Sequence, residues 1–108
     1  MKKFDAIVDV VLKDIKQELH DTLGNNIGEI ILFGSRSRGY ADKDSDYDIL
    51  VLVKRNTPSL EDQVDEVAYR MLERYGAVVT IFVEEMDIFE QEQHEPLFCN
   101  IRKEGAVL

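Results

Sequence analysis

The chain has 108 residues, of which 44% are hydrophobic and 32% charged, and its formal net charge at pH 7 is −9. This length and composition are typical of one small globular domain and leave no room for a second. The longest apolar run, Ile49–Val53, has five residues, and Asp5 and Asp9 interrupt the N-terminal region. These features argue against a membrane-spanning helix and a signal peptide, so we expect a cytoplasmic protein.

The negative charge is concentrated in the second half of the chain. Residues 56–108 contain twelve acidic and four basic residues, whereas residues 36–55 contain four acidic and five basic ones. An acidic chain repels the phosphate backbone of DNA and RNA, and the sequence has no basic stripe with interleaved aromatic residues. We therefore expect no direct nucleic-acid binding, although Arg36 and Arg38 could hold a small phosphorylated ligand.

The predicted elements follow one another without a repeat or a linker. Apolar residues recur at helical spacing from Phe4 to Leu23, which predicts a helix over residues 3–23 that ends near Gly24. The segments EIILF (29–33) and DYDILVLV (46–53) predict two largely buried strands. A second amphipathic helix follows a turn at 56–59 and ends at Gly76, and AVVTIFV (77–83) predicts a third strand. The tail predicts one or two short helices and a terminal edge strand.

This order of elements predicts an α/β domain with a small mixed β-sheet and flanking helices. The first two strands are joined by only twelve residues, 34–45, and are expected to pair antiparallel. Such pairing brings the end of the first strand, at Gly34 and Ser35, to the same sheet edge as the start of the second, at Asp46.

Asp46 and Asp48 form the first candidate site. Alternate residues of a strand point to the same side, so their two carboxylates are expected to lie together, with Tyr47 on the opposite face. A cation between them would relieve the repulsion, and hard oxygen ligands suit Mg²⁺. The plain alternative is a pair of ordinary loop acids before a strand. An EF-hand calcium loop starting at Asp42 is excluded, because its sixth position holds Tyr47 and its twelfth Val53.

The Gly34–Ser35 turn forms the second candidate site. A glycine after a strand permits close backbone approach, and a serine at the start of a helical turn offers an amide and a hydroxyl to an anion. Arg36 and Arg38 can add charged hydrogen bonds to phosphate oxygens. Neither the P-loop nor the dinucleotide-binding glycine pattern occurs in the sequence. A phosphate-binding turn beside a metal site indicates phosphoryl or nucleotidyl transfer.

The combination of Gly34-Ser35, ten intervening residues and Asp46-x-Asp48 resembles the signature of the DNA polymerase beta nucleotidyltransferase superfamily. The short chain and the GSRSRG opening resemble its minimal nucleotidyltransferase (MNT) branch. This resemblance implies one minimal nucleotidyltransferase domain over residues 1–108 with the nucleotidyltransferase fold. It also implies that Gly34 and Ser35, with Arg36, contact the nucleotide's phosphates, and that Asp46 and Asp48 are catalytic residues that hold divalent metal, with Mg²⁺ and ATP expected.

One position departs from the family pattern. The family normally carries a third carboxylate on the strand after the second helix, where this chain has Thr80. A hydroxyl cannot neutralise metal charge as a carboxylate does, so this departure bears on the binding of the catalytic metal. Glu84 and Glu85 follow this strand and could substitute only through a bend or a register shift.

Two functions therefore remain open. The first is an enzyme that transfers a nucleoside monophosphate, AMP from Mg-ATP, to a hydroxyl on a partner protein. The second is a catalytically impaired, nucleotide-binding regulatory subunit that acts by binding a helical partner. The resemblance to the MNT branch implies that this partner is a separate helical HEPN-type protein, that the chain is the antitoxin half of a toxin–antitoxin pair, and that the two form a hetero-oligomer.

Overall fold

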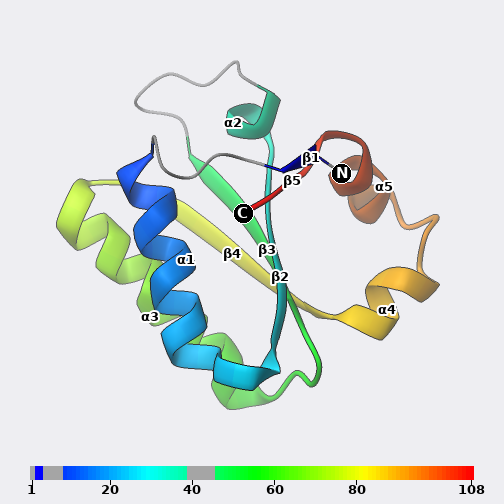
Figure 1. Cartoon of the computed structure of the whole chain (residues 1–108), viewed down its shortest axis with the longest axis horizontal. Coiled ribbons are helices and arrows are strands. Elements are labelled where there is room, and N and C mark those ends of the chain that lie inside the picture. Colours follow the sequence, from blue (N-terminus) through cyan, green and yellow to red (C-terminus); the bar gives the residue numbers. More distant parts are fainter. Residues whose placement is uncertain (1, 4–8, 39–45) are drawn as a thin grey trace.

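The computed structural model describes residues 2–3, 9–38 and 46–108 (Figure 1). Within these residues the strands form one mixed sheet in the order β1-β5-β2-β3-β4. The strands are β1 (Lys2–Lys3), β2 (Ile27–Phe33), β3 (Tyr47–Val53), β4 (Val79–Glu85) and β5 (Ala106–Val107). The helices are α1 (Val10–Leu23), the 3-10 helix η2 (Gly24–Asn26), α2 (Ser35–Arg38), α3 (Pro58–Tyr75), α4 (Met86–Gln91) and α5 (Pro96–Glu104). The predicted α/β class with a small mixed sheet is confirmed.

The first helix is shorter than predicted. It begins at Val10, where Asp9 caps it by accepting hydrogen bonds from the amides of Val11 (2.9 Å) and Leu12 (3.1 Å). Lys2–Lys3 is not helical but forms β1, parallel to β5, and the predicted helical residues 4–8 lie outside the described part of the chain. The second helix agrees more closely, because α3 ends at Tyr75 and the next residue, Gly76, adopts the left-handed conformation that stops a helix.

The C-terminal strand exists, but its predicted place at the sheet edge is wrong. β5 lies between β1 and β2 and pairs antiparallel with β2, with Leu32 opposite Ala106. The edge is formed by β1 instead. This error has a physical cause, since residues 2 and 3 are both lysine and carry none of the branched apolar residues that indicate a strand.

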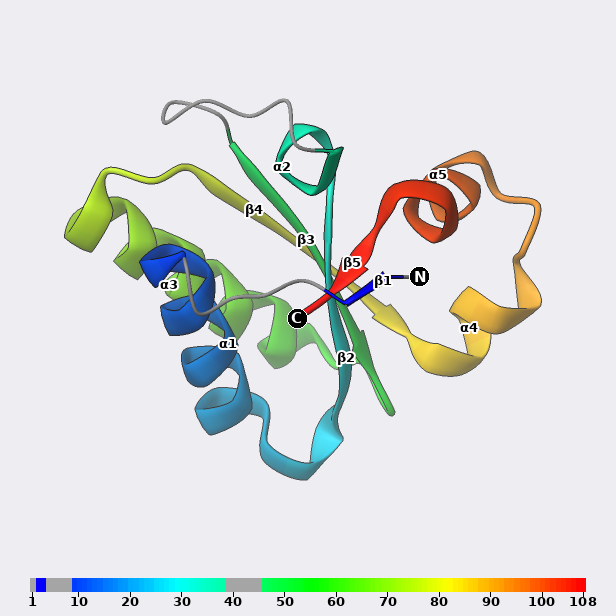
Figure 2. The same ribbon diagram turned by 45° about the horizontal axis from the view of Figure 1, so that its top comes forward.

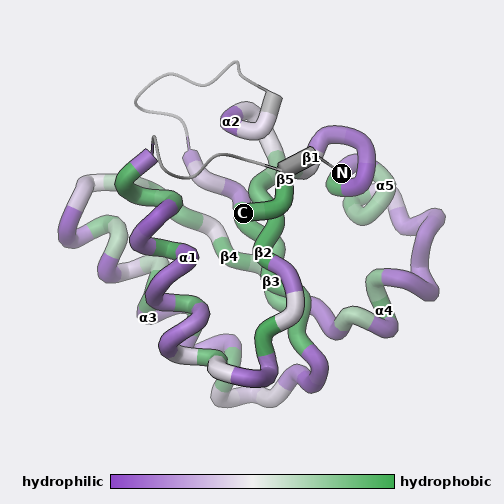
Figure 3. The backbone as a smooth tube through the Cα atoms, in the orientation of Figure 1, coloured by the Kyte–Doolittle hydropathy of each residue, from purple (hydrophilic) through white to green (hydrophobic). Residues whose placement is uncertain are grey.

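The sheet separates two layers of helices (Figure 2). α1 and α3 pack on one face, whose core includes Tyr47, Ile49 and Val51 of β3. α4 and α5 lie over the other face, where Phe89 and Phe98 meet the alternate residues of β2 and β3. The apolar segments of β2, β3 and β5 gather at the centre of the molecule, as the green parts of the tube show (Figure 3). Burial of these side chains is the main stabilising contribution to such a domain.

This alternation fixes the face on which the polar residues of β3 lie. Because Tyr47 points toward α1 and α3, its neighbour Asp48 points toward the face of α4 and α5. No helix in the described residues is both long and apolar enough to cross a membrane.

Candidate functional site

The turn after β2 requires glycine. Gly34 has a φ of +77°, and a Cβ on this residue would overlap the carboxylate oxygen Oδ2 of Asp48. Glycine therefore supplies both the left-handed backbone and the room for that carboxylate to lie against the turn. The turn is closed by Ser37, whose buried hydroxyl donates to the carbonyl oxygen of Gly34 at 2.9 Å. Ser35 begins α2 immediately beyond it.

The antiparallel pairing of β2 and β3 brings the two candidate sites together, as expected from the sequence. Asp48 is directly opposite Phe33, the residue before Gly34. Asp46 is exposed and lies just before the first residue of β3. Burial raises the pKa of the Asp48 carboxyl, and the charge of Asp46 raises this pKa further. A carboxylate whose charge is opposed by burial and by a neighbouring acid fits a divalent cation of the Mg²⁺ type, because such a cation supplies positive charge to oxygen ligands.

Thr80 occupies the position where the sequence suggested a missing carboxylate. It pairs with Asp48 in the parallel ladder of β3 and β4, and its side chain is exposed. Within residues 2–3, 9–38 and 46–108, no three His, Cys, Asp or Glu side chains are grouped so that they could hold a metal ion. Asp46, Asp48 and Thr80 thus offer two carboxylates and one hydroxyl as possible metal ligands.

The expectation that Glu84 or Glu85 could replace the third carboxylate is wrong. These residues pair with Leu52 and Val53, at the other end of β3 from Asp48. Four residues of strand separate Thr80 from Glu84, which corresponds to about 13 Å. The Glu85 carboxylate is also engaged there, because it accepts a hydrogen bond of 2.9 Å from the amide of Asn56.

Arg36 lies beneath the turn, on the α1 side of the sheet. Its guanidinium stacks over the ring of Tyr47, with 3.8 Å between Cζ and the ring centroid, and lies 3.9 Å from a carboxylate oxygen of Asp9. This is the face opposite to that of Asp48. Contact between Arg36 and a phosphate stays a prediction. The Arg38 side chain and residues 39–45 lie outside the part of the chain that the structure describes.

Tyr47 joins the same cluster from the strand. It packs beneath the sheet, as predicted, and its hydroxyl donates to the Asp9 carboxylate at 3.0 Å. Burial raises the pKa of Tyr47 to about 12, and the hydrogen bond and negative charge of Asp9 add to this effect. Sequence reasoning missed this cluster, because Asp9 and Tyr47 are 38 positions apart and each reads locally as an ordinary surface or core residue. Asp9, Arg36 and Tyr47 together tie the start of α1, the turn and the strand to one another.

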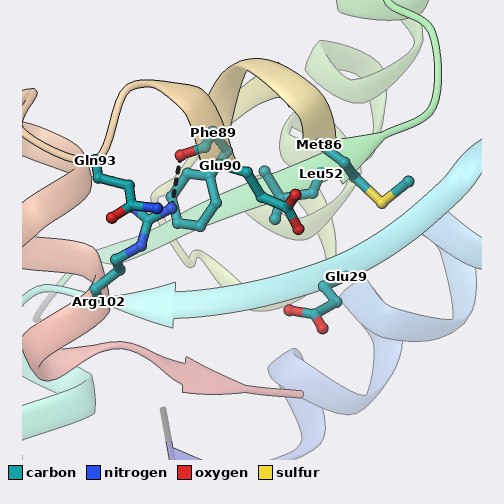
Figure 4. Close-up of a pocket in the computed structure, with 7 residues that line it drawn as sticks. All are labelled: Glu29, Leu52, Met86, Phe89, Glu90, Gln93 and Arg102. Atoms are coloured by element: carbon teal, nitrogen blue, oxygen red, sulfur yellow. Dashed lines mark hydrogen bonds between the residues drawn. The ribbon is translucent and has the colours of Figure 1, made fainter.

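Residues 86–104, which we call the α4–α5 arch, cover part of the face that carries Asp48. Arg102 stacks on the Phe89 ring at 3.9 Å and donates from Nη2 to the Phe89 carbonyl oxygen at 2.6 Å (Figure 4). Its other terminal nitrogen, Nη1, is buried with no hydrogen-bond partner among the described residues. The hollow beside it has a volume of about 410 Å³. It is lined by Glu29, Leu52, Met86, Phe89, Glu90, Gln93 and Arg102 (Figure 4).

Comparisons with known proteins agree with this geometry. The family model described as the nucleotidyltransferase domain matches residues 12–108. A Methanocaldococcus jannaschii protein, provisionally named as a protein adenylyltransferase, is 31% identical over 97 residues, covering 90% of this chain and 93% of its own. A second protein of that organism, with the same provisional name, is 33% identical over 104 residues, covering 93% and 67% of the two chains.

Solved structures share the fold. A crystal structure of a toxin–antitoxin with AMP-PNP superposes with a TM-score of 0.65 at 22% identity, over 88% of this chain and 69% of that one. A mutant of the toxin–antitoxin MntA-HpeT gives a TM-score of 0.62 at 23% identity, over 89% and 69% of the two chains.

Proposed function

The chain belongs to the nucleotidyltransferase domain family, and we propose that it transfers AMP from ATP to a hydroxyl group on a partner protein. The observation that carries this proposal is the contact between the Gly34 turn and the Asp48 carboxylate, which sets a phosphate-binding turn directly beside a pair of acids. ATP as the substrate and protein as the acceptor are supported by the provisional adenylyltransferase names of the relatives and by the AMP-PNP in a structure of the same fold.

Different residues of the chain would bind the phosphates and the metal ion. The backbone amides and hydroxyl at Gly34 and Ser35 would bind and orient the phosphates, as such turns do for anions. Asp46 and Asp48 would hold Mg²⁺, which when bound neutralises charge on the phosphates and on the departing pyrophosphate. In the reaction the acceptor oxygen forms a bond to the α-phosphorus while the bond from this phosphorus to the β-bridging oxygen breaks. Pyrophosphate leaves, and the hydroxyl proton passes to solvent. Most of the rate enhancement comes from positioning and electrostatics.

The acceptor is proposed to be a separate helical protein of the HEPN type, with this chain as the antitoxin half of a toxin–antitoxin pair. The family resemblance and the toxin–antitoxin structures of the same fold support this partnership and a hetero-oligomer. The reaction is proposed to take place in the cytoplasm, where ATP and Mg²⁺ are available.

A second candidate function rests on Thr80. A hydroxyl beside Asp48 cannot complete a site for two metals, so the chain would bind nucleotide without transferring it and act as a regulatory subunit through its partner. We favour transfer, because Asp48 lies against the Gly34 turn and Asp46 directly precedes the same strand.

Label transfer separates the two functions. The purified protein is incubated with Mg²⁺, a lysate of its source cells and ATP labelled at either the α or the γ phosphate, with Asp46→Asn plus Asp48→Asn as the blank. Transfer of AMP places the α label, and not the γ label, on a protein, and the blank abolishes it. Intact ATP binding with no labelled protein would overturn transfer and favour the regulatory subunit.

A further inference from the structure

A groove opens on the face of the sheet that carries Asp48, between β4 and the α4–α5 arch. Its volume is about 300 Å³, the lower end of the range for ligand pockets. It is lined by Leu50, Phe82, Val83, Glu84, Glu92, Glu95, Leu97 and Phe98. We call it the acceptor groove.

The groove is continuous with the candidate site. Leu50 is the next residue after Asp48 on the same face of β3, and Phe82 has the same relation to Thr80 on β4. Phe82 also packs against Phe33, the residue before the Gly34 turn, with 5.9 Å between ring centroids. The floor of the groove therefore begins about two strand residues, or roughly 7 Å, from Asp48.

The lining has an apolar floor that the described residues leave partly uncovered. Phe82 is 41% exposed and Leu97 is 38% exposed, although both are large apolar side chains. They line the groove from opposite sides, one on β4 and the other on α5. Adjacent exposed apolar side chains in a hollow are typical of a binding surface.

The rim is strongly acidic. Residues 84–95 contain six acidic residues and neither Lys nor Arg. Three of these acids, Glu84, Glu92 and Glu95, line the groove, and within the described ranges none of the three lies within ion-pair distance of a Lys or Arg. Such a rim repels the phosphates of a nucleotide and attracts a cationic segment. The charge therefore favours a segment of a partner protein, and not the nucleotide, as the occupant of the groove.

The α4–α5 arch, which carries Glu92 and Glu95 of the rim, is held in place before any partner arrives. The Arg102 side chain joins α5 to the Phe89 carbonyl, as Figure 4 shows, and the Phe89 and Phe98 rings meet edge to face at 5.1 Å. Phe98 is also part of the groove lining. A preformed groove loses less entropy when a segment binds.

We propose that the acceptor groove seats the segment of the partner protein that carries the acceptor hydroxyl, and that this segment has an apolar side chain flanked by Lys or Arg. An apolar side chain over Phe82 and Leu97 would leave the hydroxyl residue, about two positions along an extended segment, beside Asp48 and Thr80. The inference rests on the proposed function in one respect, that the bound segment carries the hydroxyl that receives AMP. Binding of the segment to the groove can be tested without catalysis.

Short synthetic peptides with a fluorescent tag serve as probes. Each carries one tyrosine two positions from a leucine; one has Lys on both flanks, a second has Glu there, and a third has Ser in place of the leucine. Binding is measured by fluorescence anisotropy, and transfer with ATP labelled at the α phosphate. The wild type is expected to bind the Lys-flanked peptide about tenfold more tightly than the other two, since like charges on the rim oppose the Glu-flanked one.

Two charge-reversed variants test the location. Glu84→Lys plus Glu92→Lys changes the rim, whereas Glu61→Lys plus Glu73→Lys makes the same change in net charge on α3, on the other layer. The rim variant is expected to lose the preference for the Lys-flanked peptide while keeping its affinity for ATP and its thermal midpoint, and the α3 variant is expected to behave as wild type.

The outcomes separate the two levels of the proposal. Selective binding with no labelling of any peptide would keep the groove and overturn the transfer function. Absent or unselective binding, or equal behaviour of the two variants, would overturn the groove. A loss of ATP affinity in the rim variant alone would assign the groove to the nucleotide and overturn the inference as well.

Discussion

Removal of the Tyr47 hydroxyl tests whether the Asp9–Arg36–Tyr47 cluster stabilises the fold at the candidate site. Tyr47→Phe removes the donor to Asp9 and keeps the ring on which Arg36 stacks. Tyr75→Phe is a matched control, because the Tyr75 hydroxyl also donates to a carboxylate, that of Asp14, at 2.8 Å. The two tyrosines differ in environment, since Tyr47 is 5% exposed and Tyr75 is 42% exposed.

The expected loss follows from the contacts that remain. A hydrogen bond to a charged group contributes about 1.5–3 kcal/mol to the free energy of unfolding. In Tyr47→Phe the Asp9 carboxylate still accepts from the amides of Val11 and Leu12 and still faces Arg36, so it is not left unpaired. We therefore expect the lower end of this range, about 1.5 kcal/mol. Tyr75→Phe should cost much less free energy of unfolding, because water can solvate both freed groups and Arg74 still pairs with Asp14.

Urea denaturation measures the free energy of unfolding of each variant. Equal m-values would show that the variants expose the same surface on unfolding. A double-mutant cycle with Asp9→Ala isolates the pair. Because Asp9→Ala removes both the α1 cap and the acceptor, it is expected to cost about 1 kcal/mol more than Tyr47→Phe, and the double variant should cost less than the sum. Equal losses in Tyr47→Phe and Tyr75→Phe, or full additivity with Asp9→Ala, would show that the buried Asp9–Tyr47 hydrogen bond does not stabilise the fold.

Three further predictions concern the Gly34 turn, Thr80 in the ladder between β3 and β4, and Asp14 in the contact between α1 and α3. Gly34→Ala should lower the free energy of unfolding by about 1–3 kcal/mol and abolish Mg-ATP binding, because its Cβ displaces Asp48; calorimetry that finds normal binding would contradict this. Thr80→Asp adds a third acid beside Asp48, so the thermal midpoint of this variant should fall without Mg²⁺ and recover when Mg²⁺ is added. Its rate of AMP transfer should rise. Thr80→Asn, which adds no charge, should show none of these changes. For Asp14, burial acts to raise the pKa from its usual 3.8, but the Tyr75 hydrogen bond helps to lower it overall. Asp14→Asn should therefore be less stable than wild type above pH 3.8, with the difference vanishing as the pH falls through the folded pKa; a difference that persists in urea titrations at acid pH would count against this.

Much of the site was predictable because its parts are local. The turn at Gly34 and the acids at Asp46 and Asp48 each stand at the end of a clear apolar run, and a short connection implies antiparallel pairing. Thr80 could be singled out from its place on the strand after the second helix, and in the structure it pairs with Asp48. These inferences needed only alternation and element order.

The parts that could not be predicted depend on contacts between distant residues. The Asp9–Tyr47 hydrogen bond and the β1–β5 pairing leave no periodic trace in the sequence. The acidic run at residues 84–95 was visible as charge alone, and only the fold shows that part of it lines a groove beside Asp48. Local patterns specify faces of elements, whereas which faces meet is decided by tertiary packing.

The position of β5 between β1 and β2 imposes an order of assembly. β1 pairs with β5 alone in the described sheet, and Lys2 is opposite Ala106, more than a hundred positions away. β1 can therefore pair only after the two ends of the chain meet, and closing so long a loop is entropically slow. β2 and β3, which carry the turn and the acids, need no such closure. We therefore expect β2 and β3 to pair before β1 joins the sheet, and the two-residue β1 edge to open more readily than the centre of the sheet.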